Sequence, residues 1–406
     1  MRINRCRICK SKNLATLFSL GNLSFTGKFS SLGKTIKKKP ITLIICKSCS
    51  LVQLAHNYDL KYLYGPDYGY RTGINKTMLS HVRKITKVLA NKTHLKKKDL
   101  VLDIASNDGS LLNFYSKGVI KCGIDPILNK YKKNYKKIKY AIPSFFSANL
   151  IRKKTKKKFK IITALSVFYD AEDPNKFLKD VSDLLAPNGV FLLEFADLAS
   201  ILKFKMFDTI CHEHLEYYST QVIIKLASEN GLKVFDIKEN KINGGSKQYF
   251  ICLKHAKIPT NNMVINKILK AEYKLKLDKV ATFKDFFKNI NNLKKRLNKI
   301  LVSIKNNNQK IHCYGASTKG NVLLQYYKIN NRMINFVAER NKNKYGLFTP
   351  GSRIKIISEK TSRELKPNYY LVLPWHFKSE ILKREKIALK RGIKFIFPLP
   401  KLKVIK

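Results

Sequence analysis

Residues 100–112, LVLDIASNDGSLL, constrain the fold of this chain more than any other segment. An apolar run ends on Asp103, small and polar residues follow, and an apolar pair resumes at Leu111; this is the pattern of a strand, a tight turn and a helix. Gly109 lets a ligand approach the backbone of that turn, and the first N–H groups of the new helix are free to bind it. The segment therefore predicts an α/β domain with a ligand site where the strand ends.

A second predicted strand, residues 119–124, ends on Asp125, and an acid at this place is the usual partner of a ribose diol. The pattern G-x-G-x-x-G is absent, which disfavours a nicotinamide or flavin cofactor; a plain turn between strand and helix is the alternative. The segment resembles the acid-x-G-x-N-D-G motif of class I S-adenosylmethionine (SAM) methyltransferases, with Ala105 where that family often has glycine. The resemblance implies these cofactor-binding residues: Asp103, Ala105, Ser106, Asn107, Asp108, Gly109, Asp125, Phe145 and Leu165.

Four cysteines near the N-terminus form two CxxC pairs, Cys6 with Cys9 and Cys46 with Cys49. Two such pairs predict a four-thiolate zinc site, and four protein ligands leave no open position, so the zinc is expected to be structural. Two redox motifs are the alternative, but no thioredoxin-like βαβ pattern surrounds them. No signal peptide and no apolar stretch of about 18 residues is visible, so we expect a cytoplasmic protein without a membrane span.

The composition is strongly basic, with 81 Lys+Arg against 27 Asp+Glu and a net charge of +54. Such a charge first suggests nucleic acid, but the lysines are spread along the chain with many Asn and Ile, as A/T-rich codon usage would produce. The densest run, residues 153–158, has no aromatic residue and is predicted to be a solvated loop rather than a phosphate site. With 406 residues, 44% of them hydrophobic, we expect two or three folded domains.

Residues 99–252 alternate strand and helix patterns, which predicts a parallel sheet with helices on both faces. An apolar stripe predicts a helical region over residues 261–307, and a second α/β unit begins at Lys310. Residues 315–321 of that unit form a small-residue turn into a helix, which is either an anion site or a plain turn. Residues 243–247 are either a second loop that faces a ligand or a plain turn before the next strand.

Residues 211–214, Cys-His-Glu-His, are the strongest candidate for chemistry in a chain with eight histidines. They do not match H-E-x-x-H, so a helical zinc site is not predicted. Glu213 could orient a neighbouring imidazole and create a base that works near neutral pH; purely structural histidines are the alternative. Residues 62–73 alternate turn formers with tyrosines and are either a lid or a packed linker.

Together these motifs resemble the bacterial nucleotide-sugar C-methyltransferase family, which methylates carbon 3 of NDP-4-keto-deoxysugars. Besides the CxxC pairs and the SAM motif, the matching segments are residues 49–54, 68–70, 207–214, 244–246, 314–321, 349–351, 374–376 and 398–400. The resemblance implies an α/β chain of three parts. They are a zinc-binding domain at residues 1–60, a class I SAM methyltransferase domain with a Rossmann-like sheet at 61–258, and connecting helices with a C-terminal Rossmann-like, sugar-nucleotide-binding domain at 259–406.

The resemblance also implies the reaction: a ketone at carbon 4 acidifies the hydrogen on carbon 3, a base removes it, and the enolate carbon takes the SAM methyl group. The implied catalytic residues are His214 as the base, Glu213 beside it, Tyr68 or Tyr70, and Tyr169 to polarise the ketone. The implied substrate-binding residues are Gly245, Ser246, Lys247, Ala316, Ser317, Thr318 and Lys319. Two residues depart from some family members, which have Tyr in place of Cys211 and His in place of Tyr169.

The leading interpretation is therefore a SAM-dependent methyltransferase, a monomer or homodimer, whose partner is a nucleotide sugar. An O-methyltransferase of a sugar or small molecule is the nearest alternative, with His214 deprotonating a hydroxyl group. A non-catalytic protein that binds nucleotide sugars is another. A nucleic-acid-binding or nucleic-acid-modifying protein would explain the charge, but no helix-turn-helix, RRM or base-flipping signature is found.

Overall fold

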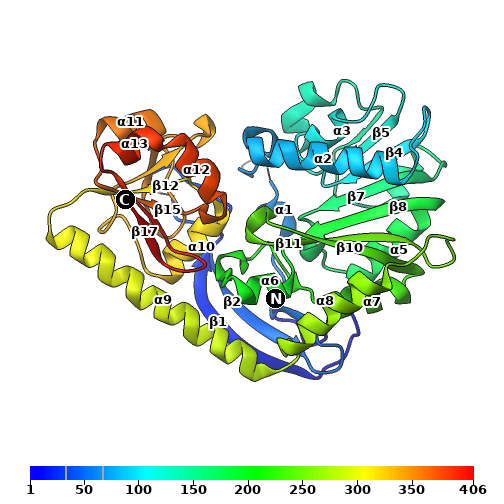
Figure 1. Ribbon diagram of the computed structural model, residues 1–406, viewed down its shortest axis with the longest axis horizontal. Coiled ribbons are helices and arrows are strands. Elements are labelled where there is room, and N and C mark those ends of the chain that lie inside the picture. Colours follow the sequence, from blue (N-terminus) through cyan, green and yellow to red (C-terminus); the bar gives the residue numbers. More distant parts are fainter. Residues whose placement is uncertain (33, 66–67) are drawn as a thin grey trace.

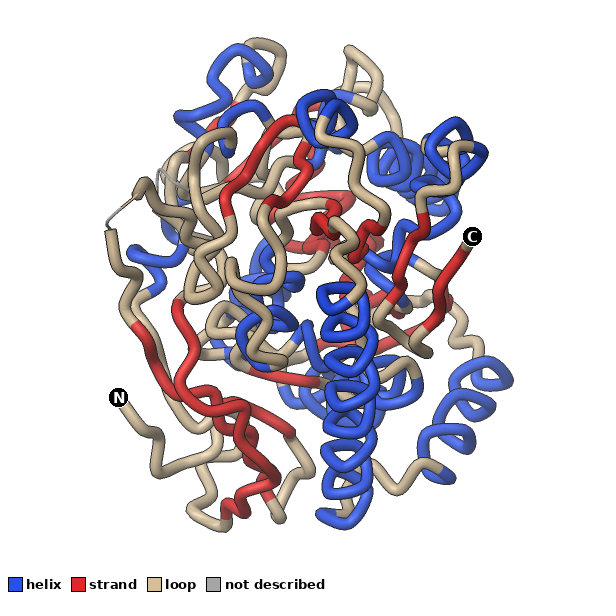
Figure 2. The backbone as a smooth tube through the Cα atoms, turned by 90° about the vertical axis from the view of Figure 1, so that its left-hand side faces the viewer, coloured by secondary structure: helices blue, strands red, loops and turns tan. Residues whose placement is uncertain are grey.

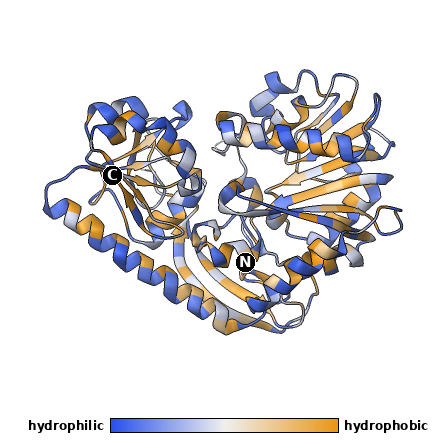
Figure 3. Cartoon of the chain, viewed as in Figure 1, coloured by the Kyte–Doolittle hydropathy of each residue, from blue (hydrophilic) through white to orange (hydrophobic). Residues whose placement is uncertain are grey.

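The computed structural model describes residues 1–32, 34–65 and 68–406. The described residues form three sheets, and Figure 1 shows the central sheet on the right, the C-terminal sheet on the left and the N-terminal strands beneath and between them. Apolar residues concentrate on the strands and on the inward sides of the helices, as Figure 3 shows. These layers confirm the predicted α/β class. Among the described residues no helix is both long and apolar enough to cross a membrane.

The N-terminal sheet has the order β1-β2-β3-β9, and all of its pairs are antiparallel. Its strands are β1 (Leu14–Ser24), β2 (Lys38–Cys46), β3 (Val52–Leu54) and β9 (Glu216–Tyr217). The short strand β9 comes from the middle of the chain and pairs with β3 through Val52 and Gln53. The N-terminal sheet therefore holds the segment that directly follows the predicted catalytic residues.

The central sheet has the order β10-β11-β8-β7-β4-β5-β6. Its strands are β4 (Leu100–Ile104), β5 (Ile120–Ile124), β6 (Tyr140–Ile142), β7 (Phe159–Leu165), β8 (Leu185–Phe195), β10 (Leu232–Asn240) and β11 (Ser246–Leu253). The prediction of a parallel sheet was wrong at one edge, because β11 runs antiparallel to both β8 and β10. A short connection at residues 241–245 makes a hairpin of β10 and β11, and a parallel crossover needs a much longer one.

Helices cover this sheet and fix the segments at its ends. They are α1 (Leu60–Leu63), α2 (Lys76–Lys92), α3 (Ser110–Asn113), α4 (Ala148–Arg152), α5 (Pro174–Leu184), α6 (Leu198–Lys203) and α7 (Thr220–Glu229). The helix α2 begins where the Asn75 side chain accepts the N–H groups of Thr77 and Met78. Its apolar face buries Val82 and Leu89 against the central core.

The predicted helical region at residues 261–307 is two helices, α8 (Asn262–Lys274) and α9 (Val280–Asn306). The two helices are separate because Lys276, just after α8, takes a left-handed conformation with φ of 51°. The long α9, vertical in Figure 2, packs its apolar stripe on the N-terminal and C-terminal layers. Phe287 of α9 stacks on Phe18 of β1, with 4.9 Å between ring centroids.

The C-terminal sheet has the order β14-β13-β12-β15-β16-β17. Its strands are β12 (Ile311–Tyr314), β13 (Phe336–Glu339), β14 (Lys355–Ser358), β15 (Tyr369–Val372), β16 (Lys394–Phe397) and β17 (Lys403–Ile405). Its helices are α10 (Thr318–Tyr326), α11 (Glu359–Glu364), α12 (Lys378–Arg384) and α13 (Lys386–Lys390). All its strand pairs are parallel except the last, so the predicted second α/β unit is present.

Candidate active site

The two CxxC pairs come together as a single cluster. The Sγ atoms of Cys6, Cys9, Cys46 and Cys49 all lie within 4.8 Å of one another. Each pair sits on the same kind of turn, which a left-handed residue closes: Lys10 donates its N–H to the Cys6 carbonyl at 3.1 Å, and Ser50 to the Cys46 carbonyl at 2.8 Å. Four thiolates in this arrangement suit tetrahedral zinc and fill its coordination. The zinc-binding site is confirmed, at a distance from the reactive groups described below.

A cavity of about 620 Å³ lies between the central and the C-terminal sheets. On one side its wall is formed by the loop after β4, by Asp125 and by residues of the tyrosine segment (62–65 and 68–73). On the other side it is formed by residues 314–319 and by Arg384. The loop that carries Glu213 and His214 also reaches the wall. The cavity thus joins three regions that are far apart in the sequence.

The loop after β4 has the shape that the sequence predicts for ligand binding. Ala105, Asn107 and Gly109 all have positive φ angles, of 56°, 50° and 74°, which bend the backbone sharply around the strand end. Asp103, Ala105, Ser106 and Asn107 line the cavity. Asp108 and Gly109 are not part of its wall and shape the turn from behind. Burial raises the pKa of Asp103 to about 7, although the Thr163 hydroxyl donates to its carboxyl group at 2.6 Å.

Asp125 lies at the end of β5 and lines the same cavity. One carboxyl oxygen accepts the N–H of Asn107 at 2.8 Å and the other accepts the N–H of Ile127 at 2.8 Å. Burial raises its pKa to about 6. A carboxylate offers about four acceptor positions, so two remain for the hydroxyl groups of a ribose. Phe145 and Leu165, the remaining predicted cofactor residues, also line the cavity, and the donor set fits SAM.

Hydrogen bonds tie the tyrosine segment to the loop after β4 (the cofactor loop). Asp108 accepts the N–H of Gly73 at 3.0 Å and the Nε of Arg71 at 3.1 Å, and Asn107 accepts the N–H of Thr72 at 3.0 Å. Tyr68 and Tyr70 both line the cavity, and Tyr70 keeps 46% of its surface exposed. Residues 66 and 67 of the predicted lid lie outside the described part of the chain. Whether the segment closes over a ligand stays a prediction.

His214 is held in one tautomer by its surroundings. Its Nδ1 donates to the carbonyl oxygen of Thr209 at 2.7 Å, which leaves Nε2 with a free lone pair. Burial and the nearby Lys319 lower the pKa of His214 to about 3. Its ring lies 4.1 Å from the ring of Tyr169, centroid to centroid, and both line the cavity. A neutral imidazole with one free nitrogen is therefore present in the wall.

Glu213 lies beside His214 in the sequence, but its hydrogen bonds go elsewhere. Its carboxylate accepts the N–H of Gly27 at 3.1 Å and the hydroxyl group of Thr26 at 3.2 Å. The imidazole of His214 is oriented by Thr209, whereas the sequence suggested that Glu213 orients it. Glu213 fastens the loop to the segment that follows β1, and it still lines the cavity.

The two predicted substrate loops have different places. Ala316, Ser317, Thr318 and Lys319 line the cavity at the start of α10. Gly245, Ser246 and Lys247 lie outside its wall. The Lys247 ammonium group is buried and forms ion pairs with Asp197 at 2.8 Å and Glu272 at 2.5 Å, which joins β11 to α6 and α8. A substrate role for this second loop stays a prediction.

Among the acids of the cavity wall, Glu339 and Asp170 belong to no predicted site. Glu339, at the end of β13, accepts the N–H of Ala316 at 2.7 Å, as Asp125 accepts that of Asn107. The same rule, an acid directly after the second strand of an α/β unit, could have found it. The other is Asp170, which no motif marks; it is buried and its carboxyl group accepts the Tyr64 hydroxyl at 2.6 Å.

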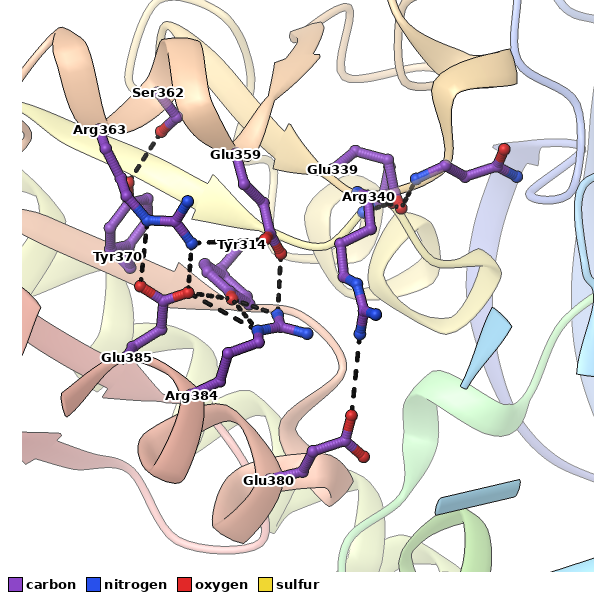
Figure 4. Close-up of polar contacts among 12 residues, drawn as sticks. Tyr314, Glu339, Arg340, Glu359, Ser362, Arg363, Tyr370, Glu380, Arg384 and Glu385 are labelled. Carbon is purple, nitrogen blue, oxygen red and sulfur yellow. Dashed lines mark hydrogen bonds and ion pairs between the residues drawn. The ribbon is translucent and has the colours of Figure 1, made fainter. Parts of the chain in front are cut away.

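The cations near the C-terminal half of the cavity fall into two groups. The arginines are paired with carboxylates, as Figure 4 shows for Arg384 with Glu359 at 2.8 Å and Arg363 with Glu385 at 2.6 Å. The lysines Lys319 and Lys344 instead donate to backbone carbonyl groups, of Asn243 at 3.1 Å and of Ala316 at 2.7 Å. Two ammonium groups bonded to neutral oxygens at the start of α10 suit an anionic ligand.

The fold and the cavity define a methyltransferase with a structural zinc site, and comparisons with known proteins agree. Three family models match successive parts of the chain: a zinc binding domain at residues 6–64, a methyltransferase domain at 74–237, and a C-methyltransferase C-terminal domain at 241–400. The C-methyltransferase NovU of Streptomyces niveus is 28% identical over 411 residues, which cover 99% of this chain and 97% of NovU. The chain is thus a SAM-dependent methyltransferase whose successive parts match models of a zinc-binding, a methyltransferase and a C-methyltransferase C-terminal domain, in agreement with the resemblance read from its motifs.

Solved structures match only part of the chain. A SAM-dependent methyltransferase from Clostridium acetobutylicum is 17% identical, with a TM-score of 0.36, and covers 43% of this chain and 92% of its own. The PH0226 protein of Pyrococcus horikoshii is 19% identical, with a TM-score of 0.36, and covers 49% of this chain and 100% of its own.

Proposed function

We propose that the protein transfers a methyl group to carbon 3 of a nucleotide-activated 4-keto-deoxysugar. The observation that carries this proposal is one cavity in which the cofactor loop, the free Nε2 of His214, Lys319 of α10 and Lys344 of the short helix Lys342–Lys344 meet. One wall suits SAM, the opposite wall suits a diphosphate, and a neutral imidazole lies at the cavity between them. The proposed parts are residues 1–60 for zinc, 61–258 for SAM and 259–406 for the sugar nucleotide.

In the proposed mechanism, the residues of the chain position the sugar and move one proton. Lys319 and Lys344 bind the diphosphate, with the N–H groups at the start of α10. Nε2 of His214 removes the proton from carbon 3, which the neighbouring ketone has acidified. Tyr169, whose ring packs on that of His214, donates a hydrogen bond to the ketone oxygen. When SAM is bound, it supplies an electrophilic methyl group for carbon 3.

The test uses the purified protein with methyl-labelled SAM and a panel of NDP-4-keto-6-deoxysugars in D2O. We expect label on carbon 3 of one sugar, and deuterium at carbon 3 when SAM is replaced by S-adenosylhomocysteine. Deuterium exchange without transfer would keep the chemistry and reject the sugar. Transfer of label to an oxygen would replace the proposal by O-methylation, and neither signal with any sugar would reject it.

A further inference from the structure

Asp170 is a buried carboxyl group in the cavity wall that the mechanism above does not use. It ends the short 3-10 helix Phe168–Asp170 and is 9% exposed. The Tyr64 hydroxyl donates to its Oδ2 at 2.6 Å. Its Oδ1 is buried and has no hydrogen-bond partner among the described residues. A buried polar atom without a partner is costly, so a group that reaches it from the cavity would gain a hydrogen bond.

The groups that face Asp170 are acidic or neutral. From the tyrosine segment they are Tyr64 and Tyr68, and from the chain next to Asp170 there is Tyr169. From the loop that carries His214 they are Cys211 and Glu213, and in and after β9 they are Glu216, Tyr217 and Tyr218. Burial, and then the negative charge of Glu213, hold the pKa of Asp170 well above its usual value, against the opposite effect of the Tyr64 hydrogen bond. These surroundings favour the neutral, protonated form of the carboxyl group.

The hydrogen-bond pattern decides which oxygen carries that proton. Because Oδ2 already accepts from Tyr64, the O–H group belongs on Oδ1, the atom that lacks a partner. The same short segment also positions the base: Leu215, next to His214, donates its N–H to the Tyr169 carbonyl at 2.7 Å. This hydrogen bond links the segment that carries Asp170 to the segment that carries His214.

We propose that Asp170 is a catalytic acid that stays protonated and donates a hydrogen bond from Oδ1 to the ketone oxygen of the substrate. This inference rests on the proposed function. As His214 takes the proton from carbon 3, the electrons of that C–H bond form the C3–C4 double bond, and the C=O electrons move to the oxygen. The O–H of Asp170 stabilises the new negative charge without transfer of its proton. When the enolate carbon bonds to the methyl group of SAM, the S–CH3 bond would break with its electrons kept on sulfur, so S-adenosylhomocysteine would be the leaving group; the ketone re-forms, and His214 returns its proton to water.

The test separates this donor from a structural carboxyl group. Loss of one donor to a developing oxyanion typically lowers kcat by about 10²–10³-fold, so we expect that loss in Asp170→Ala. Asp170→Asn keeps an N–H donor that cannot ionise, and it should retain most of kcat. In the wild type, kcat should fall as the pH rises through the pKa of Asp170, and this alkaline limb should be absent in Asp170→Asn. Asp183→Asn, which changes a partly exposed carboxylate outside the cavity wall, is the matched control.

A second variant moves the pH profile without removing the acid. The Tyr64 hydrogen bond lowers the pKa of Asp170, so Tyr64→Phe should shift the alkaline limb to higher pH. An infrared difference spectrum of substrate-free wild type minus Asp170→Asn should show the carbonyl band of a neutral carboxylic acid at neutral pH. Full activity of Asp170→Ala, or absence of that band, would overturn the inference while wild-type turnover stands. A wild type that turns over no keto sugar would instead reject the proposed function, whatever the band shows.

Discussion

His214 shows how one hydrogen bond fixes the chemistry of a side chain. Its bond to the Thr209 carbonyl keeps the free lone pair on Nε2, and its low pKa keeps the ring neutral through the physiological range. We expect His214→Ala to lower methyl transfer by about 10²–10⁴-fold, the usual contribution of a general base. SAM affinity should be unchanged, because His214 bonds to Thr209 and packs on Tyr169, and neither of these belongs to the loop after β4. His255→Ala, at an exposed position, is the control, and a fully active His214→Ala would exclude the base role.

Asp125 is expected to bind the ribose of SAM. Replacement by Ala removes a charge-assisted acceptor, so the affinity measured by calorimetry should weaken by about 1.5–3 kcal/mol. The exposed acid Asp285, replaced in the same way, is the control. Unchanged affinity in Asp125→Ala would show that the ribose lies elsewhere in the cavity.

The raised pKa of Asp125 adds a pH dependence with a definite sign. Above its pKa of about 6 the group is ionised and accepts hydroxyl groups; as the pH falls through 6, it becomes protonated and loses acceptor strength. SAM affinity of the wild type should therefore decrease from pH 7 to pH 5. The affinity of Asp125→Asn should be weaker but flat over this range, and a parallel decrease would assign the titration to another group.

Single site residues can be predicted from the sequence when they belong to a local pattern. Asp103, Asp125 and the four cysteines follow from spacing along one strand or turn, and all lie where that spacing requires. Asp170 does not follow from such spacing, because the Tyr64 hydroxyl group that donates to it comes from another segment of the chain. Lys247 also has partners that no local pattern reveals: a polar residue next to a glycine pair suggests a ligand loop, and its ion-pair partners Asp197 and Glu272 come from distant elements.

Among the elements, the cofactor loop and the tyrosine segment act as a pair. The Asp108 carboxylate accepts hydrogen bonds from the N–H of Gly73 and the Nε of Arg71, and these bonds hold the tyrosine segment next to the cofactor loop. We expect Asp108→Ala to free this segment, raise KM for the sugar and expose residues 62–73 to limited proteolysis. Ser110→Ala, which removes a different partner of Asp108, is the control. An unchanged digestion pattern in Asp108→Ala would mean that other contacts hold the segment.

The elements that the sequence misjudged are those whose direction or ends depend on neighbours. Periodicity alone marks β11 as a strand but does not give its direction, which the short connection to β10 decides. Nor does the apolar stripe reveal the break between α8 and α9, because Lys276 is an ordinary helix former that here takes a positive φ. By contrast, the turn after β4 was predictable because its small and polar residues and Gly109 favour a tight turn between a strand and a helix.

For the molecule as a whole, the zinc site supports catalysis from a distance. The cysteines fix the turns beside β2, and β3 pairs with β9. The loop that carries Glu213 and His214 is fastened to β3 by the Leu54 N–H group, which donates to the Leu215 carbonyl, and to the segment after β1 by Glu213. We expect removal of zinc, or Cys46→Ser, to abolish methyl transfer while the central sheet still binds SAM. Cys313→Ser, at a buried position in the C-terminal sheet, is the control. Activity that survives with no metal bound would contradict this coupling.

The pairing of β3 with β9 also bears on how the chain is made. The ribosome releases the first three strands of the N-terminal sheet long before it reaches residues 216–217. Until then the outer side of β3 presents unpaired backbone N–H and C=O groups, the kind of edge on which chains aggregate. A polypeptide that stops before residue 216 keeps that edge open permanently. The N-terminal zinc unit is therefore a poor choice for expression by itself, and it should remain monomeric only when the central segment is synthesised in the same chain.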